Sequence, residues 1–165
     1  MDWQEVIEHP SLQDLPFKIE LDEYGNIVMS PASNRHGRLQ ITLLNLLQKH
    51  GVSGEVYLEC AVTTRKGVKV ADVAWASAAF FQRYGETTPL PVAPEICVEV
   101  LSPSNTGTEM TEKIDLYLAK GAREVWLCDN QGRITIHAPE GVLDASRLLP
   151  SFPPDLGVNT KGSDE

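Results

Sequence analysis

The chain has 165 residues, which is enough for one domain built around a single hydrophobic core. Hydrophobic residues make up 42% and charged residues 22%, as in ordinary globular proteins, and no apolar run reaches the roughly 18 residues of a membrane helix. The N-terminal segment MDWQEVIEHP is acidic and lacks an apolar core. We therefore expect no signal peptide, no membrane partner and a cytoplasmic location.

The formal net charge of −9 counts against a nucleic-acid partner, because phosphate binding needs a basic surface. Basic residues nevertheless gather locally, and a groove can be basic while the whole chain is acidic. The candidates for nucleic-acid contact are Arg35, Arg38, Lys66 and Lys69. The alternative is that these are ordinary solvated charges.

The first predicted elements are a β-hairpin over 17–29, which turns at Tyr24-Gly25-Asn26, and a helix over 35–49. Ser33 or Asn34 is the expected N-cap of this helix, and its leucines recur on one face. Strands follow at 55–62, 68–76 and 95–101. The segment 79–94 is rich in proline and polar residues, and we expect a loop there that shapes a site entrance.

The second half of the chain begins with a helix over 107–120, for which Thr106 and Glu109 predict a capping box. Strands at 123–129 and 133–138 then form another hairpin, and a flexible tail is expected over 151–165. This order predicts an α/β fold over residues 1–150, in which helices flank a mixed sheet. Cys60, Cys97 and Cys128 fall in predicted strands without a CxxC pair, so we expect buried reduced thiols rather than a zinc site.

Two acidic residues interrupt otherwise apolar strands. Glu99 lies in EICVEVL on the face of Cys97 and Leu101, and Asp72 lies in VKVADVAWA. A buried carboxylate is costly to keep ionised unless a cation accompanies it, and Mg²⁺ or Mn²⁺ accepts oxygen ligands of this kind. The pair therefore predicts a metal site. The alternative is that each acid pairs with a buried arginine or lies at a frayed strand end.

Five further polar residues are candidates, Lys113 for a catalytic role and the other four for accessory roles. Lys113 follows Glu109 by one helical turn, with Tyr117 one turn beyond, so its ammonium either reaches the metal site or forms an exposed pair with Glu109. The other three candidates also have ordinary alternatives: a strand-face acid for Glu20, a capping or surface histidine for His36, and a simple turn residue for Ser102.

Four stretches together resemble the Uma-two family of restriction endonucleases, a bacterial branch of the PD-(D/E)XK nuclease superfamily. They are IVMSPASNRHGRL, VADVAW, ICVEVLSPSN and EKIDLYLAKGAREVWLCD, and the similarity covers about residues 17–138. The resemblance implies a restriction-endonuclease-like core of helix, three strands, helix and strand, with the N-terminal hairpin added.

The resemblance also implies metal-dependent cleavage of nucleic-acid phosphodiesters, with DNA as the expected substrate. It makes Asp72, Glu99 and the Val100 backbone carbonyl the metal ligands, with Glu20 as an additional acid. Leu101 stands where the usual motif has lysine, and Lys113 is the residue that matches the lysine of this branch. Ala71 replaces the frequent proline before Asp72.

Two other functions remain open at this point. One is an inactive nuclease fold that only binds a partner, which the net charge and Leu101 favour. The other is a structural or oligomerising protein in which Arg35 or Arg38 pairs with the strand acids. In that case, exposed strands at the hairpins would support a homodimer.

Overall fold

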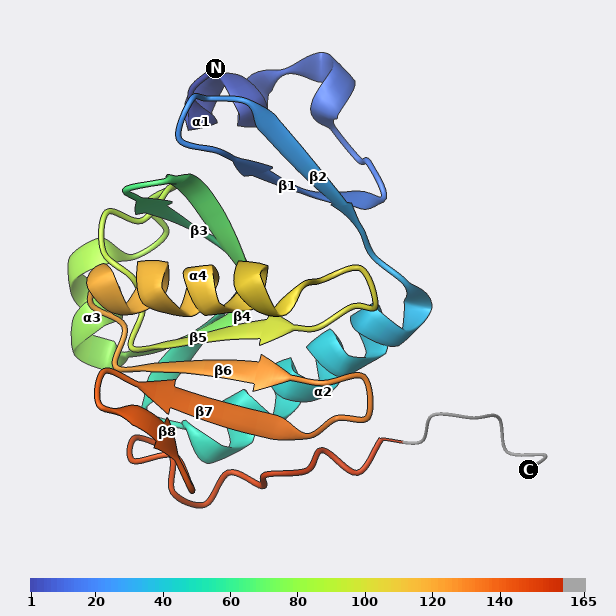
Figure 1. Ribbon diagram of the computed structural model, residues 1–165. Coiled ribbons are helices and arrows are strands. Elements are labelled where there is room, and N and C mark those ends of the chain that lie inside the picture. Colours follow the sequence, from blue (N-terminus) through green and yellow to red (C-terminus); the bar gives the residue numbers. More distant parts are fainter. Residues whose placement is uncertain (159–165) are drawn as a thin grey trace.

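The computed structural model describes residues 1–158, which form two β-sheets and their flanking helices (Figure 1). The larger sheet has the strand order β3-β4-β5-β6-β7-β8, and β1 pairs with β2 in a separate antiparallel sheet. The strands are β1 (Phe17–Leu21), β2 (Ile27–Pro31), β3 (Gly54–Thr64), β4 (Gly67–Ser77), β5 (Ile96–Val100), β6 (Glu124–Cys128), β7 (Ile134–Ala138) and β8 (Gly141–Leu143). The helices are α1 (Trp3–Glu8), the 3-10 turn η1 (Pro10–Leu12), α2 (Asn34–His50), α3 (Ala78–Tyr84) and α4 (Gly107–Ala119).

The predicted α/β class and core order are confirmed by α2, β3 to β5, α4 and β6. The caps follow the sequence signals. Ser33 accepts a hydrogen bond from the His36 N–H at the start of α2, and Thr106 and Glu109 form the capping box of α4. The β5–β6 pair is parallel while the other pairs of the large sheet are antiparallel, so this sheet is mixed.

Helices cover both faces of the large sheet, with α2 behind and α4 in front in Figure 1. The leucines of α2 pack on one face, where Val73 and Trp75 meet Val98 of the next strand. Ala74 and Cys97 alternate to the opposite face, where Tyr117 of α4 is fully buried. Glu99 shares the strand face of Cys97, so it lies beneath α4 as the alternation predicts.

The ladder between β4 and β5 is short, and its end positions the site. The register pairs Trp75 with Ile96 and ends at Val73 with Val98. Continued by one residue, it would set Asp72 opposite Glu99. The two strands diverge there, and the Asp72 carboxylate instead accepts a hydrogen bond from the Val100 N–H. A fork between neighbouring strands thus contains both acids.

The segment 79–94 departs from the predicted loop because it begins as α3. Ser77 caps this helix by accepting from the Phe80 N–H, and the rings of Phe80 and Tyr84 lie 4.7 Å apart, one turn from each other. These apolar residues at helical spacing pack against the sheet. The expected site entrance is not formed there, since β1, β2, α2 and α4 surround the acids instead.

The first part of the expected flexible tail, residues 151–158, packs against the sheet. Ile134 donates its N–H to the Pro154 carbonyl at 2.8 Å, and the Phe152 ring lies 4.7 Å from that of Trp126. Backbone pairing and apolar burial together order this segment. Residues 159–165 of the predicted tail lie outside the described part of the chain.

Two smaller expectations concern the cysteines and the membrane. Cys60, Cys97 and Cys128 are free and buried, as predicted. Across residues 1–158, no helix has both the length and the apolar character needed to span a bilayer.

Candidate active site

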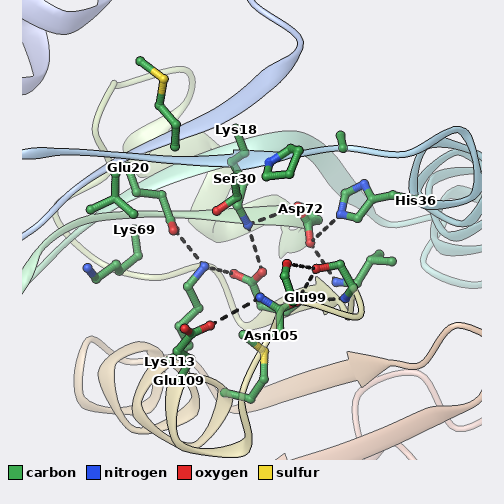
Figure 2. A pocket seen from close by; sticks show the side chains of 18 of the residues that line it. Lys18, Glu20, Ser30, His36, Lys69, Asp72, Glu99, Asn105, Glu109 and Lys113 are labelled. Carbon is green, nitrogen blue, oxygen red and sulfur yellow. Dashed lines mark hydrogen bonds and ion pairs between the residues drawn. The ribbon is translucent and has the colours of Figure 1, made fainter.

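A cavity of about 440 Å³ opens where the β1–β2 hairpin, α2 and α4 meet the fork between β4 and β5 (Figure 2). Its walls come from segments far apart in the sequence. The predicted site residues that line it are Glu20, His36, Lys69, Asp72, Glu99, Val100, Ser102 and Lys113. The fold therefore gathers most of the candidates in one place.

The two strand acids approach one another inside this cavity. Asp72 is 1% exposed and Glu99 is 2% exposed. Asp72 Oδ1 and Glu99 Oε2 both contact a single ammonium nitrogen, at 3.2 and 3.0 Å. The carboxylates thus converge on one cation-sized position, although the cation present there is an amino group of the protein.

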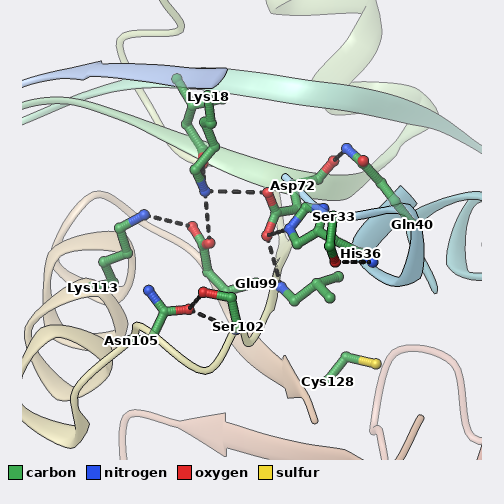
Figure 3. A network of polar contacts seen from close by, with 12 residues as sticks. Lys18, Ser33, His36, Gln40, Asp72, Glu99, Ser102, Asn105, Lys113 and Cys128 are labelled. Atoms are coloured by element: carbon green, nitrogen blue, oxygen red, sulfur yellow. Dashed lines mark hydrogen bonds and ion pairs between the residues drawn. The ribbon is translucent and has the colours of Figure 1, made fainter. Parts of the chain in front are cut away.

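That amino group belongs to Lys18, which the sequence analysis did not single out. Lys18 extends from β1 toward Asp72 and Glu99 (Figure 3), and its Nζ also donates to the Val70 carbonyl at 2.9 Å. The sequence does indicate that Lys18 accompanies Glu20, because the two residues lie two positions apart and therefore on one face of the hairpin strand. The sequence pattern does not predict that β1 packs across β4, and this packing brings that face to the two acids.

Lys113 reaches the site from α4, as the helical spacing predicts. Its Nζ lies 2.8 Å from Glu20 Oε2 and 3.3 Å from Glu99 Oε1. Glu20 in turn accepts the Val70 N–H at 2.7 Å, which ties the hairpin to β4. Lys113 therefore bonds to Glu20 and Glu99, rather than lying in an exposed pair with Glu109.

Several neighbours fix the two strand carboxylates. Tyr117 donates its hydroxyl to Glu99 Oε1 at 2.8 Å, and His36 Nε2 lies 3.3 Å from Asp72 Oδ2. Gln40, one helical turn after His36, donates to the Asp72 backbone carbonyl at 2.8 Å. The carboxylate orientations are thus set by α2 on one side and α4 on the other.

Burial and charge give the acids different pKa values. Burial raises the pKa of Glu99, and the ammonium groups of Lys113 and Lys18 offset this only in part. Burial acts on Asp72 in the same direction, but the hydrogen bond to His36 and the charge of Lys18 hold its pKa well below the usual range. Burial opposes the charge of Lys18, yet Glu99 and Asp72 outweigh it and raise the pKa of this ammonium. The cluster therefore favours a cation between the acids.

The two carboxylates suit a hard divalent cation, provided that water or substrate oxygens supply the remaining ligands. Within residues 1–158, no group of three or more histidine, cysteine, aspartate or glutamate side chains is arranged to hold a metal. Magnesium, however, is commonly held by one or two carboxylates, with water and substrate oxygens completing the shell. Asp72 and Glu99, which share one ammonium position, could supply the two carboxylates of such a site.

The remaining predicted residues are more dispersed. Arg35 donates to the Asn130 carbonyl at 3.0 Å, and Arg38 lines a separate hollow on the outer side of α2. Lys66 forms an exposed ion pair with Glu112. Lys69 alone of these four lines the cavity, where its Nζ lies 3.4 Å from the Leu21 carbonyl.

Ser102 lies in the loop between β5 and α4, at the cavity wall. Its N–H and hydroxyl both donate to Asn105 Oδ1, at 2.8 and 3.1 Å, and its hydroxyl lies 3.0 Å from that of Ser104. These bonds organise the turn that leads into α4. The loop therefore places Ser102 and Ser104 in the cavity wall, with the Ser102 hydroxyl engaged in the turn.

The fold is a mixed α/β domain in which a buried carboxylate pair lies at the fork of the larger sheet. The chain belongs to the Uma2 family, described as "Putative restriction endonuclease", whose model matches residues 3–155. A solved structure described as a putative nuclease belonging to DUF820, from Anabaena variabilis, shares the fold with a TM-score of 0.69. It is 18% identical, and the match covers 84% of this chain and 87% of that one. No curated protein matches the sequence.

Proposed function

We propose that the protein is a divalent-metal-dependent endonuclease that hydrolyses phosphodiester bonds, with DNA as its substrate. The observation that carries this proposal is the convergence of Asp72 Oδ1 and Glu99 Oε2 on one cation position. Membership in a family of this description supports it. The substrate class and the metal dependence are the parts that experiment must establish.

Asp72 and Glu99 would hold the metal, Mg²⁺ or Mn²⁺, together with the Val100 carbonyl. Within a strand, the N–H and C=O of one residue point to the same side. Because the Val100 N–H donates to Asp72 Oδ2, regular strand geometry would direct its carbonyl toward the same region. A divalent ion held there would supply Lewis-acid chemistry, that is, a lowered pKa for bound water and polarisation of a phosphate oxygen.

Lys113 supplies the positive charge on the α4 side of the cavity. A phosphoryl group that enters beside Glu99 would meet its ammonium, which stabilises charge that develops on the phosphate oxygens. Glu20 holds that ammonium from the hairpin side at 2.8 Å. Tyr117 and His36 act as positioning residues, because they contact the carboxylates rather than the cavity centre.

Plasmid cleavage tests the proposal. Purified protein is incubated with supercoiled DNA and Mg²⁺ or Mn²⁺, and the variants Asp72→Asn and Glu99→Gln are compared with wild type. Removal of either charge should reduce the cleavage rate at least about a hundredfold, a size typical for loss of one electrostatic contribution. EDTA should abolish the wild-type activity.

Glu124→Gln provides a matched control. Glu124 is also a strand carboxylate and 2% exposed, but it binds Trp126 and Ser146 away from the cavity. This variant, checked for folding by circular dichroism, should cleave at the wild-type rate. Equal cleavage by wild type and both site variants would identify a contaminant and reject the proposal.

A second function, a nuclease fold that binds nucleic acid without cutting it, is favoured by one observation. The ammonium of Lys18 already satisfies both acids. This alternative expects duplex binding that is unaffected by metal, and no cleavage by any variant. Fluorescence anisotropy with a labelled duplex, with and without Mn²⁺, distinguishes the two.

A further inference from the structure

The ammonium of Lys18 fills a three-way acceptor site at the centre of the cavity. Its three partners are the Val70 carbonyl at 2.9 Å, Glu99 Oε2 at 3.0 Å and Asp72 Oδ1 at 3.2 Å. A lysine ammonium has three donors, so all of them are used. The side chain is 12% exposed, which places the charge inside the protein rather than at its surface.

This position is also the one that a metal held by Asp72 and Glu99 would occupy. An ammonium and a divalent ion within contact of the same two oxygens would repel each other strongly at low dielectric. We propose that Lys18 is an internal competitor of the catalytic metal, which occupies the cation position in the metal-free protein and must leave it when the metal binds. This inference rests on the proposed function, since it takes the same two acids as metal ligands.

The charges of the cluster explain why an internal cation belongs there. Glu20, Asp72 and Glu99 are all at most 5% exposed, and three buried carboxylates repel one another. Lys113 contacts Glu20 and Glu99 but forms no ion pair with Asp72 among the described residues. Lys18 is the lysine that bridges Asp72 to Glu99, so it stabilises the fold of the metal-free protein.

The surroundings of Lys18 allow the exchange. Lysine carries its charge on a flexible four-carbon stem, and the cavity of about 440 Å³ lies directly beside it. β1 belongs to the separate two-stranded sheet, so movement of the Lys18 side chain breaks its bond to the Val70 carbonyl but no backbone bond between strands of the large sheet. The ammonium can therefore turn toward the open cavity while the hairpin backbone stays in place.

The consequence for metal binding can be measured without any cleavage assay. Mn²⁺ is titrated calorimetrically into metal-free wild type, Lys18→Met and Lys69→Met, and the melting temperature of each is followed with and without Mn²⁺. Lys69 is the matched control, because it lines the same cavity but bonds a neutral carbonyl. We expect Lys18→Met to melt lower than wild type without metal, to bind Mn²⁺ at least tenfold more tightly, and to gain more in melting temperature.

Chemical labelling of the wild type gives a second readout that needs no variant. Reductive methylation followed by mass spectrometry reports how accessible each lysine amine is. Lys18 should react slowly in the metal-free protein and several-fold faster with saturating Mn²⁺, while Lys69 should react equally in both. This result supports displacement even if Lys18→Met fails to fold.

The outcomes separate the competitor role from the metal site itself. Similar Mn²⁺ affinities for wild type and Lys18→Met, both lost in Asp72→Asn, would overturn the competition and leave the metal site standing. Unchanged labelling of Lys18 on saturation with Mn²⁺ would also overturn it. If Mn²⁺ binds none of these proteins, or binds Asp72→Asn as well as wild type, the proposed function and the competition fail together.

Discussion

At the residue scale, Tyr117 has an unusual partner for a buried tyrosine. Its ring is fully buried under α4, and its hydroxyl donates to Glu99 Oε1 at 2.8 Å. Burial and the nearby charge of Glu99 raise the pKa of Tyr117 well above its usual value, so the hydroxyl keeps its proton. It therefore acts as a permanent donor that fixes one Glu99 oxygen.

Tyr117→Phe should lower the free energy of unfolding by about 1.5–3 kcal/mol, the usual range for a hydrogen bond to a charged group. Urea unfolding in metal-free buffer measures it. Tyr57→Phe is the control, because the Tyr57 hydroxyl donates to the neutral Gly85 carbonyl at 2.7 Å. Loss of this hydrogen bond should lower the free energy of unfolding by only about 0.5–1.5 kcal/mol. Equal costs would argue that Glu99 is not charged in the folded protein.

Cys60 makes the stability depend on alkaline pH. Burial raises the pKa of its thiol from 9.0 to about 12. The folded protein keeps the proton that the unfolded chain releases, so this contribution is intact below pH 9 and is lost as the pH rises from 9 to 12. One pKa unit corresponds to about 1.4 kcal/mol, so the loss at pH 10.5 is about 2 kcal/mol.

Cys60→Ala tests this dependence by chemical denaturation at pH 7.5 and pH 10.5. The packing cost of the substitution applies at both pH values, so it cancels in the difference between them. We expect the wild type to lose more stability than Cys60→Ala over this interval, by about 2 kcal/mol. Parallel losses in the two proteins would show that the thiol ionises in the folded state at its ordinary pKa.

At the element scale, the β1–β2 hairpin must lie close to the β3–β4 turn for Lys18 and Glu20 to reach the cavity. Gly67 begins β4 with φ +91°, and a Cβ there would overlap the backbone carbonyls of Leu21 and Asp22. The glycine is thus required both by its conformation and by the approach of β1. The contact controls where the hairpin presents its charged face.

Gly67→Ala should cost at least about 2 kcal/mol of stability, from backbone strain and displacement of β1. The cleavage rate and the Mn²⁺ affinity should also change, because displacement of β1 moves Lys18 and Glu20 away from the two strand acids. Gly37→Ala is the control, because a Cβ in that turn of α2 meets nothing within 4 Å. That change should stabilise the protein by a few tenths to about 1 kcal/mol. Wild-type stability of Gly67→Ala would contradict the close approach.

The helices and strands also show which features of the structure can be predicted from the sequence. The α2 and α4 caps depend on residues three apart, and strand alternation depends on neighbours, so local patterns predict them correctly. The same alternation indicates that Asp72 and Glu99 are out of place in their strands. Lys18 escapes prediction because its role depends on β1 packing across β4, which is a contact between residues more than 50 positions apart. The tail segment 151–158 escapes for the same reason, since it is ordered by Trp126 and β7.

At the scale of the whole molecule, the net charge of −9 limits how the protein can bind a polyanion. The basic side chains that line the cavity are Lys18, Lys69 and Lys113, besides His36, and two of these lysines already bond buried carboxylates. Arg35 bonds the Asn130 carbonyl away from the cavity, and Lys66 is paired with Glu112, an acid of the cavity lining. Few charges are thus available for phosphates, and under the proposed function a bound metal would supply much of the attraction.

Binding of a labelled duplex to Glu99→Gln, measured by anisotropy between 25 and 200 mM salt, should therefore show a shallow salt dependence. Each neutralised phosphate contributes about −0.9 to the slope of log K against log salt, so two or three contacts give about −2 to −3. Lys69→Met in that background should reduce the slope by about one, because Lys69 lines the cavity and forms no salt bridge among residues 1–158. Lys120→Met, on the far end of α4, should leave it unchanged. A slope of −6 or steeper would mean that a larger basic surface takes part, such as one assembled from two copies of the chain.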